Sequence, residues 1–224
     1  MSIMKKYKKT ALTAALALFF CTGMTGAYAI AEPPKAQTSA INEQLIKTYK
    51  KNTSDYNVIE ALELLKDTTG EYSRKAILGE NLTQKPVKIE FRDLAAINPA
   101  YANFDALGWK KNKKLYIYIN KKHQDAPKEA LAALLAHEAI HQDELNSLNE
   151  ETYAWTLEAA VWTQLSEDNP GIQKISHPLV ERENVIKKLF EKGEYTNTYI
   201  RKFVISNKGY QNLPERSPGF EENL

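Results

Sequence analysis

Residues 128–141 read KEALAALLAHEAIH, and the rest of the chain can be interpreted around them. Their apolar, alanine-rich composition predicts a packed helix from about Pro127 to Glu144. The stretch ends in the pattern H-E-x-x-H, formed by His137, Glu138 and His141. Positions i and i+4 of a helix lie on one face, so the two imidazoles can bind one Zn²⁺. The intervening glutamate can then reach a metal-bound water and act as general base.

Two strands are expected before this helix. Residues 87–91 alternate apolar and polar side chains, as a half-buried strand does. Residues 115–119 combine aromatic and β-branched side chains, which favour strands. We expect residues 94–108 to be irregular and the lysine-rich residues 110–114 to form a solvated turn.

Helical patterns make up most of the remaining chain. Residues 41–66 predict two helices separated near residue 53, residues 149–165 predict a helix after a short turn, and residues 178–191 predict a further amphipathic helix. Residues 195–205 fit either a strand or a helix. The pattern predicts an α+β fold, mainly helical with a small β-sheet, in which the H-E-x-x-H helix is followed by an antiparallel helix that bears glutamates.

A catalytic zinc ion usually has three protein ligands and a water, so a third ligand is needed. Four glutamates are candidates: Glu144, Glu150, Glu151 and Glu158. Glu151 is favoured, because a short loop between antiparallel helices would bring it back beside His141. Glu150 points about 100° away from Glu151 on the helix. Glu144 suits a contact with an imidazole N–H better than a ligand position, and Glu158 could reach the level of His137 and orient it.

The motif and the sequence Glu151-Thr152-Tyr153-Ala154 on the next helix resemble the gluzincin branch of the zincin metallopeptidases. The resemblance covers about residues 115–165. The chain has a shorter gap between His141 and Glu151 than the well-studied members, and Trp155 where many have Asp. The resemblance implies that His137, His141 and Glu151 bind Zn²⁺ and that Glu138 activates water to hydrolyse a peptide or protein substrate.

Two other functions remain open at this point. One is a metal-dependent amidase that acts on cell-wall peptides. The other is a non-catalytic envelope binding protein that keeps the helical hairpin as a scaffold, although zinc binding alone would not require Glu138. For stabilising the transition state of hydrolysis, the candidate donors are Tyr153, His177 and Tyr195.

The N-terminus has the pattern of an export signal. Four lysines precede an apolar run at residues 11–20, and Ala27-Tyr28-Ala29 matches a signal peptidase site. We therefore expect a signal peptide at residues 1–29 and an exported protein, periplasmic or secreted. The apolar run is too short for a stable membrane span, so no membrane insertion is expected after cleavage.

Removal of residues 1–29 leaves 26 basic and 28 acidic residues, which gives no reason to expect nucleic acid as a partner. The single cysteine, Cys21, leaves with the signal, so stability must come from a packed core. We expect a flexible leader at residues 30–40, a single zincin-like metallopeptidase domain at residues 41–206 and a polar C-terminal tail at residues 207–224.

Overall fold

The computed structural model describes residues 43–80, 84–141 and 145–218. The expected signal peptide and leader, residues 1–40, lie outside the described residues, and so does Glu144. Within the described part of the chain, no helix is long and apolar enough to cross a membrane.

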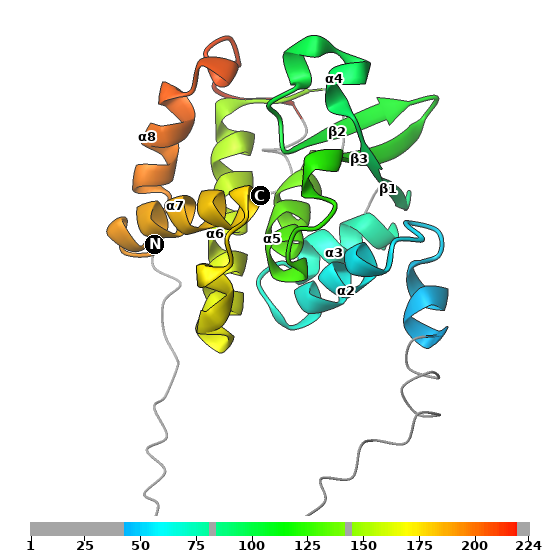
Figure 1. Ribbon diagram of the computed structural model, residues 1–224. Coiled ribbons are helices and arrows are strands. Elements are labelled where there is room, and N and C mark those ends of the chain that lie inside the picture. The colour runs from blue at the N-terminus through cyan, green and yellow to red at the C-terminus, as the bar shows by residue number, and fades with distance from the viewer. Residues whose placement is uncertain (1–42, 81–83, 142–144, 219–224) are drawn as a thin grey trace, which may run out of the picture.

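The fold is α+β and mainly helical, with one small mixed sheet, as expected (Figure 1). After a helical segment at residues 43–49, the α-helices are α2 (Tyr56–Leu64), α3 (Glu71–Leu78), α4 (Leu94–Ile97), α5 (Lys128–Glu138), α6 (Leu148–Asp168), α7 (Pro178–Lys192) and α8 (Thr198–Ser206). The strands are β1 (Val87–Arg92), β2 (Ala106–Lys111) and β3 (Lys114–Asn120). Short 3-10 turns occupy Leu65–Asp67, Pro99–Tyr101, Lys121–His123, Pro170–Lys174 and Lys208–Tyr210.

The sheet has the order β1-β3-β2, so that β2 forms an edge. The β3 strand pairs in parallel with β1 and antiparallel with β2. The expectation that residues 94–108 are irregular was wrong in two places, because they contain α4 and the start of β2. The lysine-rich stretch turns only at Asn112 and Lys113, both with positive φ, as a tight hairpin between right-twisted strands requires.

The centre of the fold is α5, which is buried on all sides. Every residue from Ala130 to Ala136 is buried, and the helix packs against α2 and α6 (Figure 1). The alanines of this stretch let neighbouring backbones approach closely, while Leu131, Leu134 and Leu135 fill the core between them. A helix that is apolar all round is expected to be a core element, and this position confirms it.

The α5 helix ends at Glu138, earlier than expected. The N–H of Ile140 bonds to the carbonyl of His137, three residues back rather than four, so the last turn tightens and stops. His141 therefore follows the helix instead of sitting on it. The other predicted helices are confirmed as α2, α6 and α7, while residues 198–206 form a helix, and α3 was not expected after Gly70.

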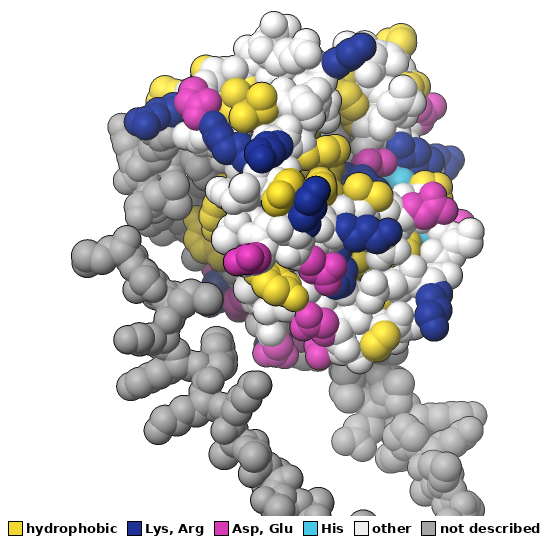
Figure 2. Space-filling model, turned by 90° about the vertical axis from the view of Figure 1, so that its left-hand side faces the viewer, with side chains coloured by type: hydrophobic (Ala, Val, Ile, Leu, Met, Phe, Trp, Pro, Cys, Tyr) yellow, Lys and Arg dark blue, Asp and Glu magenta, His cyan; other side chains and the backbone are white. Residues whose placement is uncertain are grey.

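The α8 helix packs against α6, and α7 crosses α6 and also contacts α5 (Figure 1). A second, smaller apolar cluster, centred on Trp155, Ile186 and Val204, joins the three helices. On the face seen in Figure 2, basic and acidic side chains are interspersed around hydrophobic ones.

Candidate metal centre

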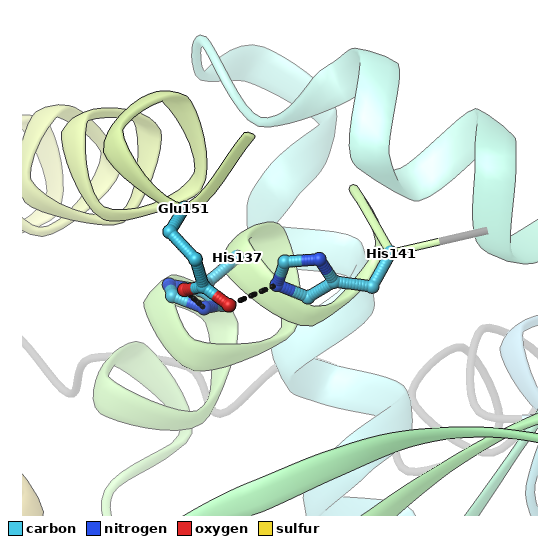
Figure 3. A group of neighbouring side chains, drawn as sticks. All are labelled: His137, His141 and Glu151. Carbon is cyan, nitrogen blue, oxygen red and sulfur yellow. Dashed lines mark ion pairs between the residues drawn. The ribbon is translucent and has the colours of Figure 1, made fainter. Parts of the chain in front are cut away.

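The structure brings together His137, His141 and Glu151, the three ligands favoured from the sequence (Figure 3). The Glu151 carboxylate hangs from the first turn of α6 between the two imidazoles. Its Oε2 lies 3.7 Å from Nε2 of His137, and its Oε1 lies 3.7 Å from Nε2 of His141. One ligand atom can be chosen from each residue so that all three atoms lie within 4.8 Å of one another.

This geometry fits a metal ion better than direct hydrogen bonds. A separation of 3.7 Å is too long for an N–H···O bond. Ligand atoms about 2.0–2.1 Å from a tetrahedral zinc ion lie about 3.3 Å apart, so the three side chains, whose ligand atoms lie within 4.8 Å of one another, would have to move closer to one another to hold the ion. In addition, Oε2 of Glu151 is buried and has no hydrogen-bond partner among the described residues. A buried carboxylate oxygen without a partner is costly, and a cation would satisfy it.

The start of α6 determines where Glu151 points. Ser147 is the N-cap, and its hydroxyl accepts a hydrogen bond from the N–H of Glu150 at 3.1 Å. Glu150 and Glu151 both lie in the first turn, where the helix dipole favours carboxylates, yet both are about 4% exposed. Asn146 donates a hydrogen bond to Oε1 of Glu151. The carboxylate is therefore held by its cap region as well as by its helix.

A second carboxylate lies beside Nδ1 of each imidazole, the ring nitrogen that faces away from Glu151. Nδ1 of His141 is hydrogen-bonded to Oε1 of Glu150 at 2.8 Å. Nδ1 of His137 lies 3.0 Å from Oε2 of Glu158. This places Glu158 beside His137, as expected. From the sequence, Glu150 was expected only as an alternative metal ligand, and its contact with His141 was not predicted. That contact depends on α6 starting at Leu148.

Glu138, the expected general base, is buried and lines the same cleft as the three ligand residues. Burial raises the pKa of Glu138 to about 7, the Glu151 carboxylate adds to this, and His141 opposes it. The main chain of Gly108, on β2, hydrogen-bonds to Glu138. A carboxyl with a pKa near neutrality can both accept and return a proton.

The pKa values of the two imidazoles are shifted in opposite directions. Burial lowers the pKa of His137 well below its usual value, and the positive charges of His141 and Arg182 lower it further. Burial acts the same way on His141, but the hydrogen bond to Glu150 and the charges of Glu151 and Glu138 outweigh it and raise its pKa to about 9.

A cleft of about 760 Å³ opens over the site. Its walls come from β2, the start of α6, α8 and the segment that follows α8, and their side chains are largely apolar: Phe104, Leu107, Trp109, Leu145, Trp155, Phe203 and Leu213. None of the three expected transition-state donors is among the lining residues. Tyr153 and Tyr195 are 40% and 60% exposed, and His177 caps the start of α7.

Two polar residues of the cleft were missed from the sequence. The hydroxyl of Tyr210 accepts a hydrogen bond from Nε1 of Trp155 at 3.1 Å. Burial raises the pKa of Tyr210, and the neighbouring carboxylate of Glu151 raises it further, so the phenol keeps its proton. Arg182 stacks over Trp155 at 4.9 Å and pairs with Glu158. Both residues lie outside the stretch that carries the motif, and no local pattern marks them.

Comparisons of the chain with protein-family models, with curated proteins and with solved structures give no match. The site must therefore be judged by its own geometry.

Proposed function

We propose that this protein is an exported zinc metallopeptidase of the gluzincin type. His137, His141 and Glu151 would hold the Zn²⁺, and Glu138 would be the general base. The observation that carries the proposal is the Glu151 carboxylate between two imidazoles, with one oxygen buried and unpartnered. Two imidazoles and one carboxylate are a common protein ligand set for catalytic zinc. Export is proposed from residues 1–29 alone.

The two outer carboxylates support the zinc assignment. An imidazole that binds a metal through Nε2 usually gives its other N–H to an acceptor, which fixes the ring and its tautomer. Glu150 is that acceptor for His141, while the Glu158 carboxylate lies 3.0 Å from Nδ1 of His137 without hydrogen-bond geometry. In both imidazoles, Nε2 is the nitrogen that faces Glu151.

When bound, the zinc ion would polarise the scissile carbonyl and acidify a water. Glu138 would take the proton of that water and pass it to the leaving amine. Tyr210 keeps its proton and faces the same cleft, so its phenol is placed to donate to the negative charge that develops on the substrate. The apolar walls of the cleft favour peptides with apolar side chains next to the cleaved bond.

The test uses the protein without residues 1–29, its metal content and its activity on a library of quenched fluorescent peptides. We expect about one zinc ion per chain and measurable cleavage. Glu138→Gln should keep the zinc and lose cleavage by at least about a thousandfold, because the general base is gone. Glu151→Ala should lose the zinc, whereas Glu167→Ala, an exposed residue on the same helix, should not.

Each result has its own meaning. A protein that binds no zinc would refute the metal centre. Zinc binding with unchanged hydrolysis in Glu138→Gln would refute the role of Glu138. Cleavage of cell-wall peptides but not of linear peptides would point to an amidase, and zinc binding without any hydrolysis to a binding protein.

A further inference from the structure

The segment after α8 returns to the start of α6, although about 60 residues separate the two in the chain (Figure 1, red end of the colour bar). We call residues 207–218 the C-terminal strap. The carbonyl of Pro214 accepts the N–H of Leu148 at 2.9 Å, and the carbonyl of Glu215 accepts the N–H of Asn149 at 3.2 Å. These are the first two N–H groups of α6, which have no partner within the helix. The strap therefore caps the helix turn that carries Glu150 and Glu151.

One side chain of the strap reaches further into the site. Ser217 is 4% exposed, and its hydroxyl lies 3.0 Å from Oε2 of Glu150 and 3.1 Å from Oγ of Ser147. An ionised carboxylate only accepts hydrogen bonds, so Ser217 is the donor to Glu150. The other oxygen of the same carboxylate, Oε1, is bonded to Nδ1 of His141. Ser217, Glu150 and His141 thus form one continuous chain of hydrogen bonds.

The strap is also tied down on its outer side. Arg201 of α8 pairs with Glu215 of the strap and donates to the side chain of Asn149 at 2.8 Å. Tyr210 and Leu213 of the strap line the cleft. The strap is therefore fixed at both α6 and α8, and Ser217 has a defined place to act from.

We infer that the C-terminal strap completes the metal centre, with Ser217 as the positioning residue for His141. Glu150 can hold the imidazole in one direction only if its own carboxylate cannot rotate. Oε1 alone leaves that rotation free, and the Ser217 hydroxyl on Oε2 stops it. Without the hydroxyl, a buried carboxylate oxygen would lose its donor from the strap, and Glu150 would be free to turn away from His141. The inference rests on the proposed metal centre.

The experiment compares the unmodified protein, residues 30–224, with Ser217→Ala, Ser217→Val and Ser217→Thr. Valine and threonine are similar in volume, so their difference reports the hydroxyl. Zinc affinity is measured by competition with a chromophoric chelator, and the ligand geometry by the visible absorption of the Co²⁺-substituted proteins. We expect Ser217→Ala and Ser217→Val to bind zinc about 10- to 100-fold more weakly and to change the Co²⁺ spectrum. Ser217→Thr should be close to the unmodified protein in both measurements.

Ser206→Ala is the matched control. Ser206 is exposed on α8, and its hydroxyl bonds only locally, to the carbonyl of Phe203 at 2.9 Å. It should leave zinc affinity unchanged. The metal-free forms of all variants should still fold and unfold cooperatively.

Three outcomes would overturn the inference. Affinities of the Ala and Val variants within twofold of the unmodified protein would do so. So would equal losses in Ser217→Thr and Ser217→Val, or failure of the metal-free Ala and Val variants to fold, since the hydroxyl would then serve the fold and not the metal. An unmodified protein that binds no metal would instead refute the proposed function, and the two failures are thus distinct.

Discussion

Oε2 of Glu158 lies 3.0 Å from Nδ1 of His137, on the side of the imidazole that faces away from the proposed metal. Glu158 is fully buried, and its other oxygen pairs with Arg182. Arg182 also bonds to Asp105 at 3.1 Å and to Glu183 at 3.0 Å. One guanidinium therefore holds three carboxylates, and one of them is aimed at His137.

We expect Glu158→Gln to weaken zinc binding about 10- to 100-fold, because a neutral amide replaces the negative charge that lies beside Nδ1 of His137. The same substitution should cost about 3 kcal/mol of unfolding free energy, since the buried Glu158 carboxylate that pairs with Arg182 is lost. Chelator competition measures the first effect and urea unfolding of the metal-free protein the second. Glu167→Gln, on the exposed face of α6, is the control and should change neither. Unchanged zinc affinity in Glu158→Gln would show that Glu158 serves only the buried charges.

The sequence predicts those parts of the site that depend on residues close together in the chain. The apolar run of α5 and the spacing of its histidines predict a buried helix with two imidazoles close together, and the short loop predicts Glu151 beside them. The roles of Glu150 and Ser217 depend on contacts across 67 residues and on a helix that begins at Leu148 rather than Asn149. No periodicity in the chain contains that information.

The edge strand β2 was missed for a related reason. Its sequence, Ala106–Lys111, contains a glycine and two lysines and lacks the alternation that marks a half-buried strand. Its place in the sheet comes from pairing with β3 through the hairpin at Asn112 and Lys113. Tertiary pairing outweighs weak local preference here.

The glycine of β2 lies against the motif. A Cβ atom built at Gly108 would be 3.3 Å from Cβ of His141 and 3.9 Å from Oε2 of Glu138. The first distance is tighter than ordinary van der Waals contact. We expect Gly108→Val to reduce hydrolysis at least about tenfold by displacing His141 or Glu138, and Gly108→Ala to have a smaller effect. Gly171→Val, in an open position before α7, should have none. Full activity in Gly108→Val, measured on the same peptide substrate, would contradict this close packing.

Asp105 gives the protein a defined sensitivity to acid. Burial alone would raise the pKa of its carboxyl, but the hydrogen bond to His123 and the charges of Arg182 and Lys122 together hold it well below the usual 3.8. A depressed pKa contributes stability that is present above the unfolded-state value and is lost as pH falls through the folded-state value. The contribution should therefore be complete above about pH 5 and disappear progressively below about pH 4.

Asp105→Asn should consequently unfold more easily than the unmodified protein at pH 7, by about 2 kcal/mol. The difference should shrink as pH falls below 4, because the unfolded state then takes up a proton on this carboxyl while the folded state, with its depressed pKa, keeps it ionised. Urea unfolding from pH 3 to pH 7 measures it. Asp67→Asn, an exposed position, is the control and should follow the unmodified protein throughout. A difference that is constant with pH would show that the lost contacts are not electrostatic.

Tyr210 provides the sharpest test of how the cleft would act on a substrate. Its phenol is the one side-chain hydroxyl among the residues that line the described cleft, and it lies beside Glu151. Tyr210→Phe removes the donor and keeps the ring, so we expect kcat to fall about 10- to 1000-fold while KM and zinc content change little. Tyr153→Phe and Tyr195→Phe are matched controls, because neither residue lines the cleft. If kcat falls in either control and not in Tyr210→Phe, the donor is one of the tyrosines expected from the sequence, and the cleft must rearrange when it binds a peptide.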